Sequence, residues 1–114
     1  MSTRHILLIF SLLAVISAAS AATRRGPVLG GYRPIKDIKD PYVQEIAKFA
    51  VDEHNKEEGS HLKLVKIVKG ESQVVSGTNY RLTLSADDSQ KYVAVVYDKP
   101  WQHQRSLTSF EKSE

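Results

Sequence analysis

The spacing of the apolar residues changes once along the chain, and this change constrains the fold more than any other feature. Between residues 41 and 58 the apolar side chains recur at helical spacing. Those on one side of the expected helix are Val43, Ile46, Ala47, Ala50, Val51 and His54, with Phe49 widening the stripe. Asp40 suits the N-cap, Pro41 the first helical position, and Gly59 the left-handed stop. These signals predict one long helix.

From residue 62 onward the apolar period is two, which is typical of β-strands. The expected strands cover residues 62–72, 78–85, 91–98 and 107–110. In the first of them the alternation breaks between Leu64 and Val65, which predicts a bulge. One helix followed by a strand meander buries its apolar surface by packing on the sheet. We therefore predict an α+β fold, with the helix against an antiparallel sheet of four to five strands.

Residues 1–22 have the layout of a secretory signal peptide: a basic start, an apolar run and a series of small residues. The run is too short to span a bilayer, and no later segment is apolar enough. We expect a secreted protein, extracellular or vacuolar, without membrane contact once the leader is removed. Residues 23–114 suffice for one small domain. It begins with an arm at residues 23–33, whose glycines and proline predict an extended, flexible segment.

Charge and cysteine content exclude several classes of function. Removal of Arg4 with the leader takes the formal net charge from +3 to +2, which is too little for a nucleic-acid-binding surface. The 114 residues contain no cysteine, so disulfides, thiolate metal sites and a cysteine nucleophile are absent from them. No nucleophile elbow or phosphate loop occurs either. We expect neither an enzyme nor a cofactor or metal site.

Two turns carry apolar residues where small polar residues are usual. The first is Gln73-Val74-Val75-Ser76-Gly77, and the second contains Pro100-Trp101. Valine at a turn tip exposes apolar surface to water, which favours a partner that buries it. Because alternate connections of a meander lie at the same end of the sheet, the two turns should lie side by side. They predict an apolar wedge.

The order of a Gly-Gly pair, a QVVSG turn and a Pro-Trp pair resembles the cystatins. The helix sequence from Ile46 to Asn55, IAKFAVDEHN, is similar to the plant branch, and the absence of cysteine agrees with it. The resemblance covers the whole of residues 23–114. It implies a single-domain plant cystatin without a carboxyl extension.

This resemblance implies a reversible, tight-binding, competitive inhibitor of papain-like cysteine proteases, with a role either in plant defence or in the regulation of endogenous proteases. The protease-binding residues that it implies are Val28, Leu29, Gly30, Gly31, Gln73, Val74, Val75, Ser76, Gly77, Pro100 and Trp101. Gly30 and Gly31 lack a Cβ, so the backbone there can pass close to a catalytic centre. Trp101 offers the largest contact area of the set.

Two alternatives stay open from the sequence. The first is a non-inhibitory binding or structural module on the same scaffold. The second concerns assembly: we expect a monomer, with a domain-swapped dimer as the alternative, because strained β-branched residues in the Val74-Val75 turn favour opening of the hairpin.

Overall fold

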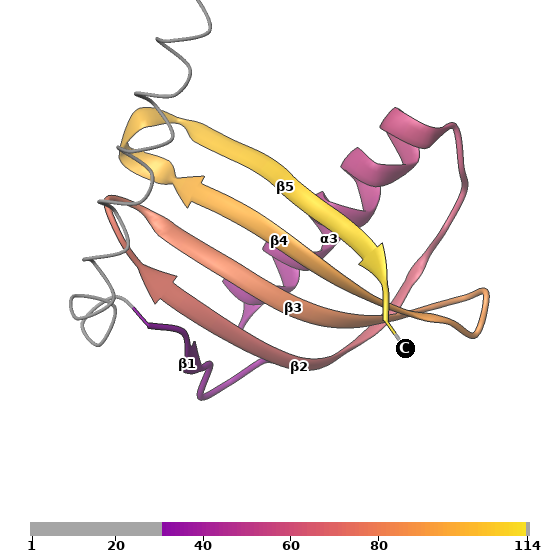
Figure 1. Ribbon diagram of the computed structural model, residues 1–114, viewed down its shortest axis with the longest axis horizontal. Helices are drawn as coiled ribbons and strands as arrows, with labels where there is room; N and C mark the ends of the chain where they lie inside the picture. The colour runs from indigo at the N-terminus through magenta and orange to yellow at the C-terminus, as the bar shows by residue number, and fades with distance from the viewer. Residues whose placement is uncertain (1–30, 114) are drawn as a thin grey trace, which may run out of the picture. The chain divides into compact units, whose positions relative to one another are not determined.

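The computed structural model describes residues 31–113 (Figure 1). The elements are, in chain order, β1 (Arg33–Pro34), α3 (Pro41–Glu58), β2 (Leu64–Val74), β3 (Thr78–Ala86), β4 (Lys91–Lys99), the 3-10 turn η2 (Pro100–Gln102) and β5 (Gln104–Lys112). The expected leader at residues 1–22 and most of the arm at 23–33 lie outside the described residues, so both stay predictions.

The helix α3 begins and ends where its capping residues predict. The Asp40 side chain accepts a hydrogen bond from the Tyr42 backbone N–H at 2.8 Å, and Pro41 occupies the first turn. Gly59 ends the helix in the left-handed conformation, at φ 67°. Neither helical segment of the described chain is long and apolar enough to cross a membrane.

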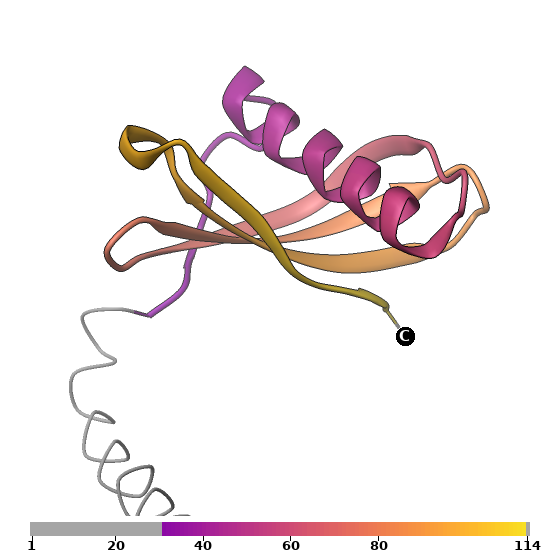
Figure 2. The ribbon, with the colours of Figure 1, turned by 90° about the horizontal axis from the view of Figure 1, so that it is seen from above.

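The five strands form one antiparallel sheet in the order β1-β2-β3-β4-β5, which confirms the α+β prediction. The helix lies across one face of this sheet (Figure 2). The β2–β3 and β4–β5 connections lie at one end of the sheet, while the β3–β4 turn lies at the other (Figure 1). The predicted adjacency of the two apolar turns is therefore confirmed.

The core forms where α3 meets the inner face of β2, β3 and β4. Its fully buried members include Ile46 from the helix, with Leu82, Leu84 and Val96 from the sheet. The apolar stripe predicted for the helix is buried at Val43, Ile46, Ala47, Ala50 and Val51. His54, also predicted for the stripe, stacks on the Phe110 ring with 4.0 Å between ring centroids.

Three bulges decide which side chains face the helix. In β2 the register skips Val65 and Val68, so Leu64 and Ile67 both face α3 although they are three residues apart. This confirms the predicted bulge and adds a second. In β5 Ser109 pairs with Val95 and Leu107 with Val96, which leaves Thr108 as the extra residue.

The strand ends differ from the sequence prediction. β2 continues through Val74, which pairs with Thr78, so only residues 75–77 form the turn. β5 is also longer, because backbone pairing with β4 continues through polar residues on both sides of the predicted 107–110 segment. The short strand β1 pairs with Ser72 and Glu71, and the apolar period gave no signal for it.

The buried face of β3 supplies the first testable prediction. Leu82 is 0% exposed, so Leu82→Asp places an unpaired charge in the core and should lower the free energy of unfolding by more than about 4 kcal/mol. Val75 is 49% exposed, so Val75→Asp should change it by less than about 0.5 kcal/mol. Urea unfolding followed by circular dichroism measures both. Equal destabilisation by the two substitutions would contradict the exposed position of Val75.

Candidate functional site

Three large apolar side chains project into water at the end of the sheet that carries the β2–β3 and β4–β5 connections. Val74 is 72% exposed, Val75 49% and Trp101 65%. We call these three residues the apolar tip. Two further exposed valines, Val65 and Val68, occupy the bulges of β2 and belong to a different region. The apolar tip is therefore a grouping that the topology produces.

The first loop, which we define as the turn 75–77 together with Val74 at the end of β2, is a tight connection with its own hydrogen bond. The Val75 backbone N–H donates to the Gly77 carbonyl at 2.9 Å. Just before the loop, the Gln73 side-chain oxygen accepts a hydrogen bond from the Asn79 amide at 3.0 Å. Gln73, which the resemblance assigned to protease binding, thus also ties the two strands together at the base of the loop. Ser76 is exposed within the loop.

The second loop, residues 100–103, contains the turn η2. Its closing hydrogen bond runs from the His103 N–H to the Pro100 carbonyl at 2.9 Å, and His103 takes the left-handed conformation at φ 51°. The Lys99 ammonium lies 5.9 Å from the centroid of the Trp101 ring, within cation–π range. The loop holds Trp101 at the surface, so this tryptophan is not a core residue.

The first loop is packed against the end of β4 at Gly77. A Cβ at this position would lie 2.6 Å from the Asp98 carbonyl oxygen and 3.1 Å from the Lys99 Cβ. Real Cβ atoms do not approach backbone oxygen so closely, so only glycine allows this contact. The first loop therefore rests directly on the strand that leads into the second.

The amino-terminal part of the predicted site is only partly described. Val28, Leu29 and Gly30 lie outside the described residues, and Gly31 directly precedes Tyr32. The Arg81 guanidinium stacks over the Tyr32 ring at 3.9 Å.

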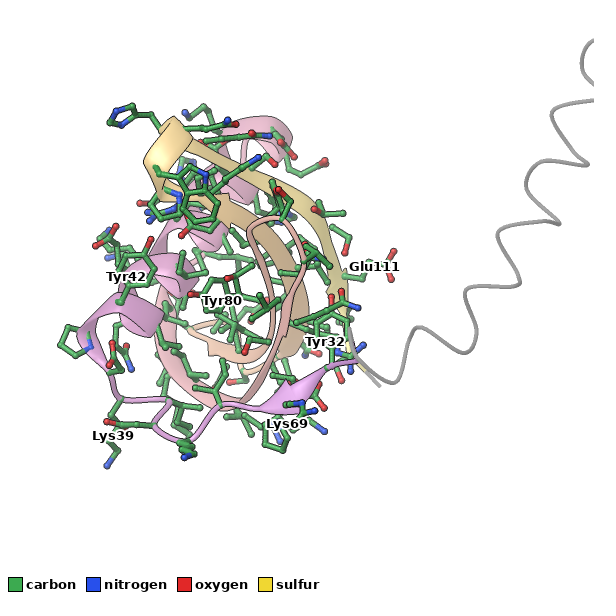
Figure 3. The ribbon with its side chains drawn as sticks, turned by 90° about the vertical axis from the view of Figure 1, so that its left-hand side faces the viewer. Tyr32, Lys39, Tyr42, Lys69, Tyr80 and Glu111 are labelled. Carbon is green, nitrogen blue, oxygen red and sulfur yellow. The ribbon has the colours of Figure 1, made fainter. Side chains whose placement is uncertain are left out.

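Arg81 is itself held by Glu71, which accepts a hydrogen bond from its Nε at 2.8 Å. This bond lowers the pKa of Glu71 and raises that of Arg81. Tyr32 lies on the opposite side of the sheet from Tyr42 (Figure 3). The chain thus enters the domain through a stacked contact on the outer face of the sheet.

A polar network at the base of the second loop was not predicted from the sequence. Asp98 is 2% exposed, and its carboxylate accepts hydrogen bonds from Arg105 Nε at 2.7 Å and from the Tyr42 hydroxyl. Arg105 also donates to Glu45 at 2.8 Å and to the Tyr42 oxygen at 3.1 Å. We call Tyr42, Glu45, Asp98 and Arg105 the polar clamp.

Burial and these hydrogen bonds perturb the groups of the polar clamp. Burial raises the pKa of the Tyr42 hydroxyl, and its hydrogen bond to Asp98 raises it further. For Arg105, burial alone lowers the pKa, but the hydrogen bonds to Asp98, Glu45 and Tyr42 outweigh it and raise the pKa. The Arg105 guanidinium is therefore cationic at neutral pH.

The arrangement offers contact surface and no reaction chemistry. Within residues 31–113 no group of three His, Asp or Glu side chains is placed to hold a metal ion. Buried side-chain polar atoms in that part of the chain all have hydrogen-bond partners. The exposed apolar tip is thus the feature of the described residues that a partner would cover.

The contact at Gly77 leads to the second testable prediction. Gly77→Ala would force the first loop away from Asp98 and Lys99, and should lower the free energy of unfolding by about 1–3 kcal/mol. Ser76→Ala, on the neighbouring exposed residue, is the control and should change it little. Chemical denaturation of both variants checks this. If Gly77→Ala were as stable as Ser76→Ala, the first loop would not be packed against Asp98 and Lys99 of β4.

Comparison with known proteins agrees with this architecture. A family model described as "Aspartic acid proteinase inhibitor" matches residues 35–113. Cysteine proteinase inhibitor 5 of Arabidopsis thaliana is 51% identical over 111 residues, covering 92% of this chain and 88% of that protein. Cysteine proteinase inhibitor 1 of Actinidia chinensis var. chinensis is 49% identical over 92 residues, covering 78% and 79%. These descriptions name proteinase inhibitors, which confirms the expectation that the chain is not an enzyme.

A solved structure extends the likeness to the fold. The salivary cystatin of the soft tick Ornithodoros moubata superimposes with a TM-score of 0.65 at 26% identity, covering 75% of this chain and 98% of that one. The one-helix, five-strand architecture is therefore the cystatin architecture. Together with the plant relatives, it shows that the chain belongs to the plant cystatin (phytocystatin) family.

Proposed function

We propose that this chain is a reversible, tight-binding inhibitor that competes with substrate for the cleft of papain-like cysteine proteases. Val74, Val75 and Trp101 enter the cleft as a wedge, and the arm with Val28, Leu29, Gly30 and Gly31 runs along it. The names of the plant relatives support the class of target. Ser76, Gly77, Pro100 and Gln73 shape and support the two loops.

The observation that carries this proposal is the apolar tip. Its side chains gather at one end of the sheet, where the first loop rests through Gly77 on the strand that leads into the second. Valine and tryptophan side chains have few rotamers, so burying them costs little conformational entropy. A preformed wedge of this kind binds a preformed groove at small entropic cost.

Magnitudes show why the arm matters. Fully burying an apolar side chain of this size contributes roughly 1.5–3 kcal/mol. Three of them therefore contribute an amount comparable with the cost of association, which is about 4–15 kcal/mol. Tight binding then needs further contacts, and we propose that Val28 and Leu29, apolar residues of the arm, supply them.

The mode of inhibition follows from the chemistry of the chain. A catalytic cysteine could be captured covalently through a disulfide, but the 114 residues contain no cysteine to form one. We therefore propose that the loops occlude the cleft without a covalent bond, and that the bound inhibitor leaves intact.

A titration of papain tests the proposal. Adding the chain without residues 1–22 to papain and a fluorogenic peptide should abolish activity at a one-to-one ratio, with recovery on dilution and competition by substrate. Papain whose thiol carries a methylthio group should still bind the chain, because the contacts lie mainly in the loops. Full papain activity at micromolar chain would contradict the proposal and favour a non-inhibitory module on this scaffold.

Two controls make the titration specific. Val75→Asp should weaken inhibition by about 10-fold or more, since a charge replaces an apolar contact, while the protein stays folded. Pepsin at acid pH tests the second candidate target, because the matching family model is described for an aspartic acid proteinase inhibitor. We expect pepsin to keep its activity. If the chain inhibited pepsin and not papain, its target would be an aspartic protease and not a cysteine protease.

The arm leads to a prediction of its own. A chain that begins at Gly30 lacks Val28 and Leu29 but keeps both loops. Its dissociation constant for papain should rise by about 10- to 100-fold, after allowance for the ordering of the arm. The change should appear mainly as faster dissociation, measured by stopped-flow or surface plasmon resonance. Equal constants for the two chain lengths would show that the loops are the whole site.

A further inference from the structure

We infer that the polar clamp is a positioning device for protease binding: it sets the direction in which the second loop presents Trp101. This inference rests on the proposed function. The four clamp residues lie at the base of the loop and act through it, without touching the protease. They are Tyr42, Glu45, Asp98 and Arg105.

The clamp closes the base of the second loop from both strands. Asp98 and Arg105 are opposite each other in the β4–β5 register, and the loop lies between them in the chain. Their side chains are joined by the 2.7 Å hydrogen bond from Arg105 Nε to the Asp98 carboxylate. The two ends of the loop are thus fixed to each other by a charged pair as well as by backbone pairing.

The same pair is fixed to the helix. Tyr42 and Glu45 come from the first turns of α3, and Arg105 donates to both of them. The Tyr42 hydroxyl in turn donates to Asp98. The Tyr42 and Tyr80 rings are neighbours, with 6.5 Å between their ring centroids, on the side of the molecule that faces the viewer in Figure 3. The second loop therefore keeps a set angle to the helix.

Asp98 also links the two loops. Its side chain belongs to the clamp, while its carbonyl oxygen lies against Gly77 of the first loop. Backbone pairing of Asp98 with Thr78 fixes this contact independently of the Asp98 side chain. Loss of the clamp should therefore act on the second loop and leave the first loop in place.

Stability alone does not account for the clamp. Replacing a buried ion pair with apolar residues of similar volume is often neutral or stabilising. Apolar packing would not fix the orientation of the loop. The planar guanidinium of Arg105 does, because it holds three hydrogen-bond acceptors at fixed angles. A device with fixed angles matters where a loop must point into a cleft.

The chain carries its own reporter for this inference, since Trp101 is its single tryptophan. Arg105→Lys keeps the charge but cannot reach Asp98, Glu45 and Tyr42 together. We expect lower fluorescence anisotropy of Trp101 in the free variant, and a dissociation constant for papain about 10-fold higher, because the second loop would present Trp101 in more than one direction. Tyr42→Phe keeps the Asp98–Arg105 pair and should give a smaller change of the same kind.

A double-mutant cycle separates positioning from a general loss of stability. If the clamp acts through the second loop, Arg105→Lys should change the papain dissociation constant by less than about 2-fold when Trp101→Ala is already present. An equal factor in both backgrounds would overturn the inference. So would an unchanged Trp101 anisotropy in Arg105→Lys.

Arg81→Lys is the matched control, because Arg81 is also held by a carboxylate but alternates with the buried Leu82 and so lies on the outer face of the sheet. It should leave the Trp101 anisotropy unchanged. If Arg81→Lys changes papain binding through Tyr32, the change in the dissociation constant should be the same with and without Trp101→Ala. If the parent chain does not bind papain, the proposed function fails, and the anisotropy of the free variants still decides whether the clamp orders the loop.

Discussion

The contact between α3 and the sheet is the interaction on which the rest of the structure depends. With no cysteine in the chain, this contact has no covalent reinforcement. Ala47 and Ala50 on the helix and Ala94 on β4 are each 0% exposed, and their small size lets helix and sheet approach closely. Larger side chains fill the space on either side of them. The loops can project into water because the core holds without their apolar residues.

Local sequence signals predicted the parts of the fold that depend on local physics. Asp40 and Gly59 mark the helix ends because capping needs these residue types at these positions. The exposure of Val74 and Val75 followed from their place at a connection between strands. The first bulge of β2 was visible as a break in alternation, since Leu64 and Val65 are both apolar.

The polar clamp escaped the sequence analysis because it depends on a register shift. Thr108 is bulged out of β5, and this moves Arg105 to the helix side, opposite Asp98. One signal of the bulge was the spacing of Leu107 and Phe110, which are three residues apart although both pack on the core. A signal of the clamp was Asp98, which continues the buried, helix-facing series of Ala94 and Val96, where a charge needs a partner. Its partner, Arg105, could be named only from the three-dimensional register.

The bulges also bear on how the protein behaves in concentrated solution. An open strand at the edge of a sheet is a template for pairing with another molecule. Here β1 covers part of β2, and Pro34 has no N–H to offer, while Val65 and Val68 interrupt the rest of that edge. Thr108 interrupts the opposite edge. Edge-to-edge pairing of the described sheet is thereby opposed on both sides, and the apolar tip lies at its end, away from both edges.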